Sequence, residues 1–350
     1  MCEKMWAGVV HAKDDIRYEQ IDKPEPRAGE VLVKVKYSGI CGSDVPRVLG
    51  DACHYYPNVL GHEFSGTIES VGEGVEGLNP GDRVAGAPLV PCMKCEDCQR
   101  GDYSLCKHYS FIGTRQFGSF AEYVCIRAVK FDESVSFEQA ALIEPTTIAL
   151  HGLERLDYEG GKTVAVLGGG TIGIITAQWA RAFGAREVTV FDVIPERLDF
   201  AKKMGATSVV NSMDEDWKDQ VATITDGLGY DYVYETAGAN ATMHMVFEVV
   251  GNKGQACLIG KPTRELTFTV AEWEKLNRKE FTLTGSWLGY TAPFPGHEWT
   301  LTAEAYRNGM IPYDEGHIFD KYPLAKISEA FDQFRTPGLV KGKILIDCEQ

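Results

Sequence analysis

Four cysteines lie close together in the segment PCMKCEDCQRGDYSLC, and they are Cys92, Cys95, Cys98 and Cys106. The spacing C-x2-C-x2-C-x7-C supplies four thiolate ligands within one short segment, which is typical of a closed tetrahedral zinc site. Two alternatives use the same residues: an iron–sulfur cluster, or surface thiols with no common role. A closed four-cysteine site has no open coordination position. The segment therefore predicts a structural zinc, and catalysis must depend on other residues.

Three further residues have the chemistry of a metal site that keeps one position open. Cys41 lies in GICGSD, His62 in GHEFSG and Glu144 in IEP. A thiolate, an imidazole and a carboxylate together leave the fourth position of a zinc ion free, as catalytic zinc requires. Each residue also has an ordinary explanation: Cys41 and His62 as core residues, and Glu144 as a helix cap. Their spacing alone does not bring them together.

A glycine motif indicates a nucleotide site. Gly168, Gly170 and Gly173 form G-x-G-x-x-G between an apolar strand, KTVAVL, and a helical segment. This context predicts that a pyrophosphate lies at the helix N-terminus. Asp192 ends the next strand, where a carboxylate binds the ribose 2′-hydroxyl and repels a 2′-phosphate, so NAD is expected rather than NADP. Arg197 follows closely, either to pack on the adenine or as a solvated helix residue.

The elements that must position these residues fall into two classes. Up to about residue 130, short alternating segments separated by Gly and Pro predict a β-rich, barrel-like domain. From about residue 145, apolar strands alternate with helices, which predicts a parallel, doubly wound sheet and an α/β fold. A chain of 350 residues is longer than one core usually serves, so two domains are expected.

The charge composition of the chain disfavours some classes of binding partner. The net charge is -15, with acidic residues spread along the chain, which disfavours binding to nucleic acid and to anionic membranes. We find no signal-peptide pattern and no apolar run of about 20 residues that could span a bilayer. A cytoplasmic protein is therefore expected.

In this order, GICGSD, GHEFSG, GDRV, the four-cysteine segment and GGGTIG resemble the zinc-dependent medium-chain alcohol and polyol dehydrogenases. The resemblance implies a GroES-like β-rich catalytic domain over residues 1–147 and 286–350, with a Rossmann nucleotide domain inserted over 148–285. It also implies two zinc ions and one NAD per chain, a small polyol or polyol phosphate as substrate, and a homodimer or homotetramer.

By the same resemblance, Cys41, His62 and Glu144 bind the catalytic zinc. Glu63 is their neighbour and can ligate the metal in some states, while the Ser43 hydroxyl passes the substrate proton toward solvent, with His54 as a weaker relay candidate. The nucleotide contacts implied are Gly168, Gly170, Thr171, Ile172, Gly173, Asp192, Arg197, Ile259 and Ser286.

Four segments bear on the substrate: HYYP at 54–57, FIGTR at 111–115, GSW at 285–287 and PFPGHEW at 293–299. They are similar to segments of a polyol-phosphate branch of the family and are expected in loops. Arg115, Tyr55 and Trp287 are the implied substrate contacts, with Arg115 for a phosphate. Alternatives are a sorbitol- or xylitol-type enzyme for free polyols, a threonine-type dehydrogenase, and a non-catalytic relative. The presence of all seven zinc ligands argues against the last.

Overall fold

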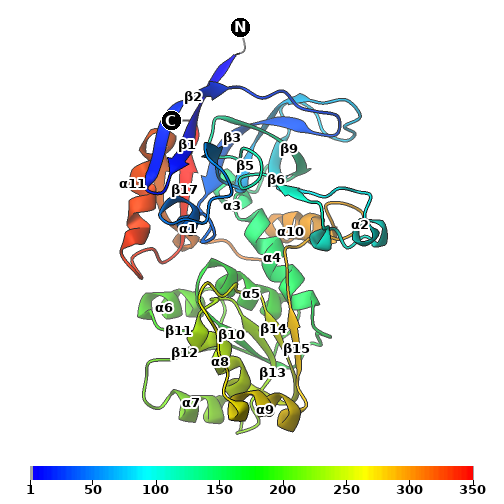
Figure 1. Cartoon of the computed structure of the whole chain (residues 1–350). Coiled ribbons are helices and arrows are strands. Elements are labelled where there is room, and N and C mark those ends of the chain that lie inside the picture. The colour runs from blue at the N-terminus through cyan, green and yellow to red at the C-terminus, as the bar shows by residue number, and fades with distance from the viewer. Residues whose placement is uncertain (1–2, 350) are drawn as a thin grey trace. The chain divides into compact units, whose positions relative to one another are not determined.

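The computed structural model describes residues 3–349, which divide into two compact units. The first comprises Met1–Pro145, Tyr290–Gly309 and Tyr313–Gln350, and the second comprises Thr146–Gly289 and Met310–Pro312. Each unit has its own six-stranded sheet (Figure 1).

The first unit is β-rich. Its larger sheet has the order β16-β17-β3-β5-β6-β9, and β3 also pairs with β9, so that β3, β5, β6 and β9 close on themselves. A second sheet has the order β2-β1-β4. The strands are β1 (Lys4–Ala12), β2 (Asp15–Asp22), β3 (Val31–Gly39), β4 (Asn58–Val59), β5 (Glu63–Val71), β6 (Arg83–Ala87), β7 (Leu89–Val90), β8 (Ser110–Phe111), β9 (Tyr123–Lys130), β16 (Ile318–Pro323) and β17 (Lys343–Asp347).

Buried apolar residues that alternate with more exposed ones explain why such segments form strands. In β3, Val31, Val33 and Val35 are fully buried and belong to one core cluster, while Lys34, between Val33 and Val35, is exposed. Short helices fill the connections of this unit: α1 (Val45–Val48), α2 (Glu96–Arg100), α3 (Phe137–Ala140), α10 (His297–Arg307) and α11 (Ile327–Asp332), with 3-10 turns at Tyr103–Leu105, Glu315–His317, Leu324–Lys326 and Gln333–Arg335.

The second unit has an all-parallel sheet of order β12-β11-β10-β13-β14-β15. Its strands are β10 (Thr163–Leu167), β11 (Glu187–Asp192), β12 (Ser208–Asn211), β13 (Tyr230–Glu235), β14 (Val250–Leu258) and β15 (Thr282–Gly285). Its helices are α5 (Thr171–Ala182), α6 (Pro195–Lys203), α7 (Trp217–Ile224), α8 (Asn240–Val249) and α9 (Val270–Lys279), and α4 (Ile143–Glu154) leads into it from the first unit. The strand order reverses beside β10, which is where such sheets bind nucleotides. The α/β fold class expected from the sequence is confirmed.

One expectation about the substrate segments is wrong in part. The sequence predicts a loop over residues 293–299, but the last residues of this segment, from His297, begin α10, and Trp299 is completely buried. The aromatic character of this segment therefore serves the core, where Trp299 packs against Tyr290.

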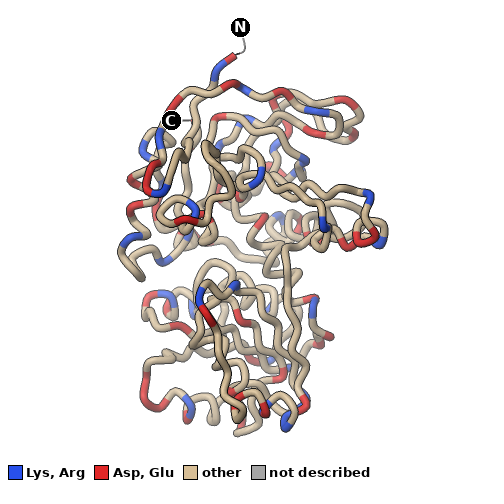
Figure 2. The backbone as a smooth tube through the Cα atoms, viewed as in Figure 1, with Lys and Arg blue, Asp and Glu red and all other residues tan. Residues whose placement is uncertain are grey.

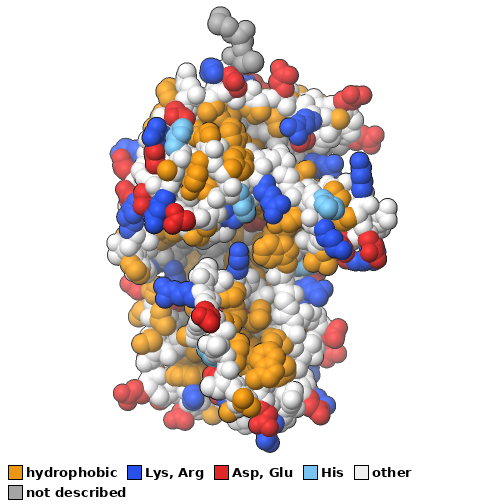
Figure 3. Space-filling model, in the orientation of Figure 1, with side chains coloured by type: hydrophobic (Ala, Val, Ile, Leu, Met, Phe, Trp, Pro, Cys, Tyr) orange, Lys and Arg blue, Asp and Glu red, His pale blue; other side chains and the backbone are white. Residues whose placement is uncertain are grey.

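Lysines, arginines and acids alternate along the backbone of both units (Figure 2). On the face shown in Figure 3, both signs of charge are likewise interspersed with apolar side chains. Within residues 3–349, no helix has the length and apolar character that crossing a membrane requires.

Candidate metal centres and nucleotide site

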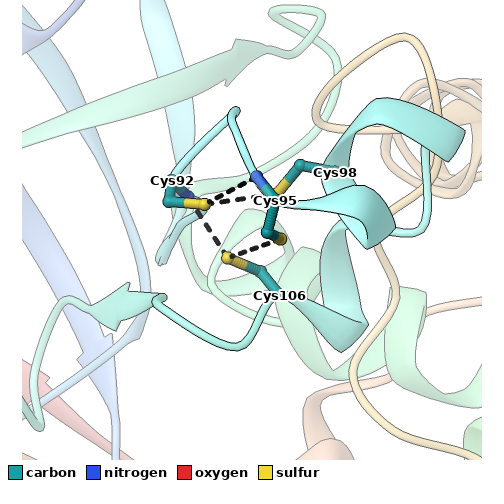
Figure 4. A group of neighbouring side chains, drawn as sticks. All are labelled: Cys92, Cys95, Cys98 and Cys106. Carbon is teal, nitrogen blue, oxygen red and sulfur yellow. Dashed lines mark hydrogen bonds between the residues drawn. The ribbon is translucent and has the colours of Figure 1, made fainter.

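The four cysteines of the 91–106 segment converge on one point (Figure 4). Their sulfurs all lie within 4.8 Å of one another, with Cys92 Sγ 4.0 Å from Cys98 Sγ and Cys95 Sγ 3.9 Å from Cys106 Sγ. A zinc ion with Zn–S bonds of about 2.3 Å separates its tetrahedral ligands by about 3.8 Å, so the sulfurs stand at the spacing of a zinc site. They are free thiols and too far apart for disulfides.

Hydrogen bonds from backbone amides stabilise the thiolate forms of two of these cysteines. The amides of Lys94 and Cys95 donate to Cys92 Sγ at 3.5 and 3.3 Å. These hydrogen bonds lower the pKa of Cys92, and the amide of Cys98 does the same for Cys95, whose pKa falls to about 6. Burial instead raises the pKa of Cys98 to about 12. A divalent cation would complete this partly ionised set, so the residues fit structural zinc.

A second group joins Cys41, His62 and Glu63, whose ligand atoms also lie within 4.8 Å of one another. Glu63 begins β5, directly after His62, and both side chains are buried. Cys41 follows the end of β3, the strand that pairs with β5. The antiparallel β3–β5 pair therefore explains how the separate motifs GICGSD and GHEFSG meet.

Glu144 is buried in the first turn of α4 and lies outside that mutual group, although its charge interacts with those of Cys41, His62 and Glu63. Burial raises the pKa of Glu144 to about 8, and the Glu63 carboxylate adds to the effect. Burial, again with help from Glu63, raises the pKa of Cys41 to about 12. A divalent cation would stabilise the ionised forms of these buried acidic donors, so this donor set fits catalytic zinc.

Sequence reasoning missed three charged residues around this group. Lys343, at the start of β17, lies with its Nζ 2.5 Å from Glu63 Oε2. Asp44 is completely buried, with Oδ1 3.6 Å from His62 Nδ1 and 3.7 Å from an amino group of Arg47. Asp44 and Arg47 could have been predicted from the sequence, since both follow GICGS. Lys343 could not, because only the pairing of strands brings it close to Glu63.

The two proton-relay candidates differ in their surroundings. Ser43 is exposed, and its hydroxyl donates to Cys41 Sγ at 3.3 Å, so it lies beside the ligand group and next to solvent. His54 lies in the exposed segment between α1 and β4. Its neighbour Tyr55 is also exposed and accepts a hydrogen bond from the Cys53 thiol through its carbonyl.

The glycine motif in the second unit has the geometry that a pyrophosphate needs. Gly168 takes φ 112°, and a Cβ on Gly173 would stand 1.8 Å from the Gly168 carbonyl oxygen, so both positions require glycine. Gly170 caps α5, and a Cβ there would meet no atom within 4 Å. The space before Thr171 and Ile172, the first residues of α5, is therefore open to a ligand at the helix N-terminus.

Asp192 ends β11 beside this turn. Its Oδ2 accepts from the Gly169 amide at 2.7 Å, and its Oδ1 accepts from the amides of Val193 and Ile194 at 2.8 and 2.9 Å. Arg197, on α6, has an amino group 3.7 Å from Asp192 Oδ2. The carboxylate is thus fixed at the end of the strand that follows the glycine turn, with a guanidinium next to it.

Ile259 and Ser286 directly follow β14 and β15, at the same carboxyl edge of the sheet as Gly168 and Asp192. The Ile259 amide donates to Glu235 and the Ser286 amide donates to Leu258, which extends the ladder by one residue on each strand. The Ser286 hydroxyl oxygen is buried without a hydrogen-bond partner among the described residues. Trp287 comes next and is half exposed.

Arg115 lies on the first unit in a pocket of about 450 Å³. Its guanidinium stacks on the Tyr109 ring at 4.4 Å and donates to the Tyr109 carbonyl at 3.3 Å. The pocket lining includes Arg27, Glu25 and Phe117 but neither Cys41 nor His62. The structure thus gives Arg115 a cavity of its own and does not bring it into the metal group.

Comparisons with known proteins agree with this geometry. Residues 27–132 match the alcohol dehydrogenase GroES-like domain, and residues 171–304 match the zinc-binding dehydrogenase family. The chain is 41% identical to galactitol 1-phosphate 5-dehydrogenase of Escherichia coli K12 over 273 residues, which are 77% of this chain and 79% of that protein.

The chain belongs to the zinc-dependent medium-chain dehydrogenases. Within this family, sorbitol dehydrogenase of Bacillus subtilis 168 is 37% identical over 278 residues, covering 75% of this chain and 76% of that one. The crystal structure of galactitol-1-phosphate dehydrogenase from E. coli superposes with a TM-score of 0.92 at 36% identity, over 98% of this chain and all of that one. This medium-chain dehydrogenase is therefore an enzyme with the expected two-part fold.

Solved structures that are similar to this chain contain either nucleotide. A zinc-binding dehydrogenase of Sinorhizobium meliloti 1021 holds NADP (29% identity, TM-score 0.87, 99% of both chains). A protein of E. coli CFT073 described as a short chain alcohol dehydrogenase holds NADH (28% identity, TM-score 0.88, 98% and 99% of the chains). This medium-chain dehydrogenase therefore uses a nicotinamide nucleotide, and the choice between the two depends on its own residues.

Proposed function

We propose that this chain is an NAD-dependent polyol dehydrogenase that oxidises a secondary hydroxyl of a hexitol phosphate such as galactitol 1-phosphate, giving tagatose 6-phosphate. The reaction transfers a hydride from the carbinol carbon to NAD⁺ and releases the hydroxyl proton. The observation that carries the proposal is the buried donor set around Cys41, in a chain 41% identical to galactitol 1-phosphate 5-dehydrogenase.

Two zinc ions per chain are proposed. The four cysteines hold one, and Cys41, His62 and Glu144 hold the other. Glu144 is proposed as the third ligand because IEP resembles the ligand segment of the polyol dehydrogenases and because Glu63 is already paired with Lys343. Zinc bound there supplies a Lewis acid that lowers the pKa of a coordinated alcohol.

The chain's own side chains move the proton. The Ser43 hydroxyl lies beside Cys41 Sγ and is exposed, so it is the proposed first acceptor of the substrate proton on the path to solvent. His54 lies in an exposed segment and is proposed only as a later member of that path.

NAD is proposed over NADP because of Asp192. Three backbone amides hold its carboxylate at the end of β11, where the ribose hydroxyls of a dinucleotide lie in this fold. A 2′-phosphate would meet that negative charge. The Arg197 guanidinium lies against the same carboxylate and offsets part of this repulsion. We propose that Arg197 packs on the adenine.

Recognition of the substrate phosphate is assigned to Arg115, because a guanidinium can meet a phosphate through two parallel hydrogen bonds. Its exposed position and its pocket leave the guanidinium accessible to a ligand. Tyr55 and Trp287, both half exposed, are the other proposed substrate contacts.

The test is NADH production across a panel of free and phosphorylated polyols, with wild type and Arg115→Ala. We expect the hexitol phosphate to be the best substrate. We also expect Arg115→Ala to lower kcat/KM on the order of ten- to a hundredfold for the phosphate only, as losing a charged hydrogen bond does. Lys107→Ala, which removes an exposed cation eight residues earlier in the chain, is the control. An equal loss of kcat/KM on free and phosphorylated polyols would show that Arg115 does not bind the phosphate.

A second candidate function is oxidation of a free polyol. The 37% identity to sorbitol dehydrogenase favours it, as does the placement of Arg115 in a pocket whose lining lacks the metal ligands. A wild-type preference for free sorbitol or xylitol in the same panel would select this function.

A further inference from the structure

Glu235, at the end of β13 in the second unit, has a completely buried carboxyl group. Its Oε1 accepts hydrogen bonds from the amides of Ala237 and Gly238 at 3.0 and 2.9 Å and from the Thr242 hydroxyl at 2.6 Å. Its Oε2 is buried and has no hydrogen-bond partner among the described residues. One oxygen of the carboxyl group is therefore fully satisfied and the other is not, which in a protein core needs an explanation.

The surroundings of this carboxyl group supply no charge that would compensate an ionised form. β10 and β14 place Leu167 and Leu258 beside Glu235, and α8 contributes the neutral hydroxyl of Thr242. Lys261, the charged residue of the segment that follows β14, is exposed, and no residue within 3–349 forms an ion pair with Glu235. Burial raises the pKa of Glu235 against the effect of its three hydrogen bonds. A neutral acid with one unpaired oxygen costs less free energy here than a carboxylate does.

The turn that follows Glu235, residues 236–238, packs against the glycine motif. The Thr236 hydroxyl lies 3.2 Å from the Gly168 carbonyl oxygen. A Cβ on Gly168 would stand 3.0 Å from the Ala237 Cβ. The turn therefore fixes the first glycine of G-x-G-x-x-G, beside the proposed place of the pyrophosphate.

The same carboxyl group lies against the segment that follows β14. The amides of Ile259 and Gly260 donate to the Glu235 carbonyl at 2.8 and 2.9 Å. A Cβ on Gly260 would overlap with both Glu235 Oε2 and the Gly238 nitrogen. Oε2 therefore faces Gly260 at the carboxyl edge of the sheet, next to Ile259, which is one of the implied nucleotide contacts.

We propose that Glu235 is a positioning residue for the dinucleotide: as a neutral acid it holds the 236–238 turn between the glycine motif and Gly260, and loss of its proton weakens nucleotide binding. An ionised Oε2 has no donor in its buried place, so the turn must shift to let water reach it. The new charge also lies at the edge of the sheet that receives the negatively charged phosphates. The proposal rests on the nucleotide site put forward above.

The direction of the pH effect follows from linkage. The nucleotide binds the protonated enzyme more tightly, so the pKa of Glu235 is higher in the complex than in the free enzyme. Affinity is then full below the free-enzyme pKa and falls as the pH rises through it.

The experiment measures the Kd of ADP-ribose for the full-length, zinc-loaded enzyme by calorimetry from about pH 5 to about pH 9. ADP-ribose carries both phosphates but no nicotinamide, so it reports binding without the reacting ring. Glu235→Gln keeps the shape of the neutral acid and cannot titrate, whereas Glu235→Ala leaves the two turn amides without their acceptor. Glu187→Gln is the control, because Glu187 is a half-buried acid at the start of β11, at the opposite edge of the sheet.

We expect Glu235→Gln to have the wild-type Kd at the acidic end of the range. Toward the alkaline end, the wild-type Kd should rise on the order of tenfold more than that of Glu235→Gln, which corresponds to a pKa difference of about one unit between free and bound enzyme. Glu235→Ala should bind ADP-ribose more weakly at every pH, because the turn loses the group that closes it. Glu187→Gln should follow the wild-type curve.

Weaker binding by Glu235→Gln at the acidic end, or a pH dependence as steep as that of the wild type, would overturn the proposal. If Glu235→Gln does not fold, the wild type decides. Its binding of ADP-ribose, measured in buffers of different ionisation enthalpy, must take up protons in the pH range in which the Kd rises, and proton release or no exchange would overturn the proposal. NADH production from polyols, measured alongside, tests the proposed function separately, since polyol oxidation does not require that Glu235 titrate.

Discussion

At the scale of single residues, burial decides which ionisable groups are available to a metal. Cys41, Glu63 and Glu144 are all acidic groups that interact with His62, yet Glu63 has Lys343 as its partner. Cys41 and Glu144 both have raised pKa values because burial disfavours their charged forms. Such groups ionise when a cation binds, which couples metal uptake at this site to proton release.

Glu144→Gln tests the choice between the two carboxylates. The amide has nearly the same shape but no charge, so we expect the zinc content to fall from two ions per chain to one. We expect turnover to drop by more than about 100-fold, the upper end of what outer-shell changes cost. Metal analysis and polyol kinetics measure both. Glu159→Gln, an exposed acid a few residues after the end of α4, is the control. A variant with two zinc ions and near-normal turnover would make Glu63 the ligand.

Asp192→Ala tests the cofactor preference. The alanine removes a carboxylate that is fixed by three amides, so NAD should lose on the order of ten- to a hundredfold in kcat/KM while NADP loses less. The ratio of the two kcat/KM values measures the effect. Asp199→Ala, an exposed acid on α6, should leave the ratio unchanged. Equal use of both nucleotides by the wild type would contradict the assignment.

At the scale of elements, the sequence predicts what is local. The glycine motif, its strand and its helix lie within residues 163–182, and the four cysteines lie within one segment, so the sequence alone predicts both. It does not predict the place of Lys343, because that depends on β17 pairing with β3, and such a register does not follow from the residues of β17 alone. The aromatic segment at 293–299 is misassigned in part because a buried aromatic such as Trp299 cannot be distinguished by type from a ligand contact.

Cys95→Ser tests the element that carries the four cysteines, which lies between β7 and β8. The hydroxyl is a poor zinc ligand, so we expect loss of one zinc ion, a lower Tm and new protease cleavage within residues 92–106. The metal at the Cys41 site should remain in Cys95→Ser. The double variant Cys95→Ser/Glu144→Gln should then contain no zinc, which metal analysis measures. Cys125→Ser, a thiol outside both groups, is the control. Two zinc ions in Cys95→Ser would argue against a four-cysteine zinc site.

At the scale of the whole molecule, the first unit is built from both ends of the chain. β16 and β17, from the C-terminal part, extend the sheet that β3, β5, β6 and β9 form near the N-terminus. Besides the Lys343–Glu63 pair, Lys321 on β16 lies 3.1 Å from Glu138 on α3. These ion pairs join segments that only the complete chain brings together, so their loss should be visible in the stability of the whole enzyme.

Glu138→Gln tests the second of these links through its pH dependence. Burial raises the pKa of Glu138, but hydrogen bonds from its own amide and from Lys321 outweigh this and leave the pKa below 4.5. A carboxyl with a lowered folded-state pKa stabilises the fold fully above about pH 4.5, and the contribution is lost as the pH falls through the folded-state pKa. Gln cannot titrate, so the Tm of the Glu138→Gln variant should lie below that of the wild type at neutral pH, and the difference should shrink below pH 4.5.

The ion pair is partly exposed and is worth about 1 kcal/mol at most, or a Tm difference of about 2–4 °C. Thermal melts from pH 3 to 8 would measure it, with Glu133→Gln, an exposed acid five residues away, as the control. A Tm difference that stays constant or grows on acidification would show that Glu138 does not stabilise the fold through this ion pair.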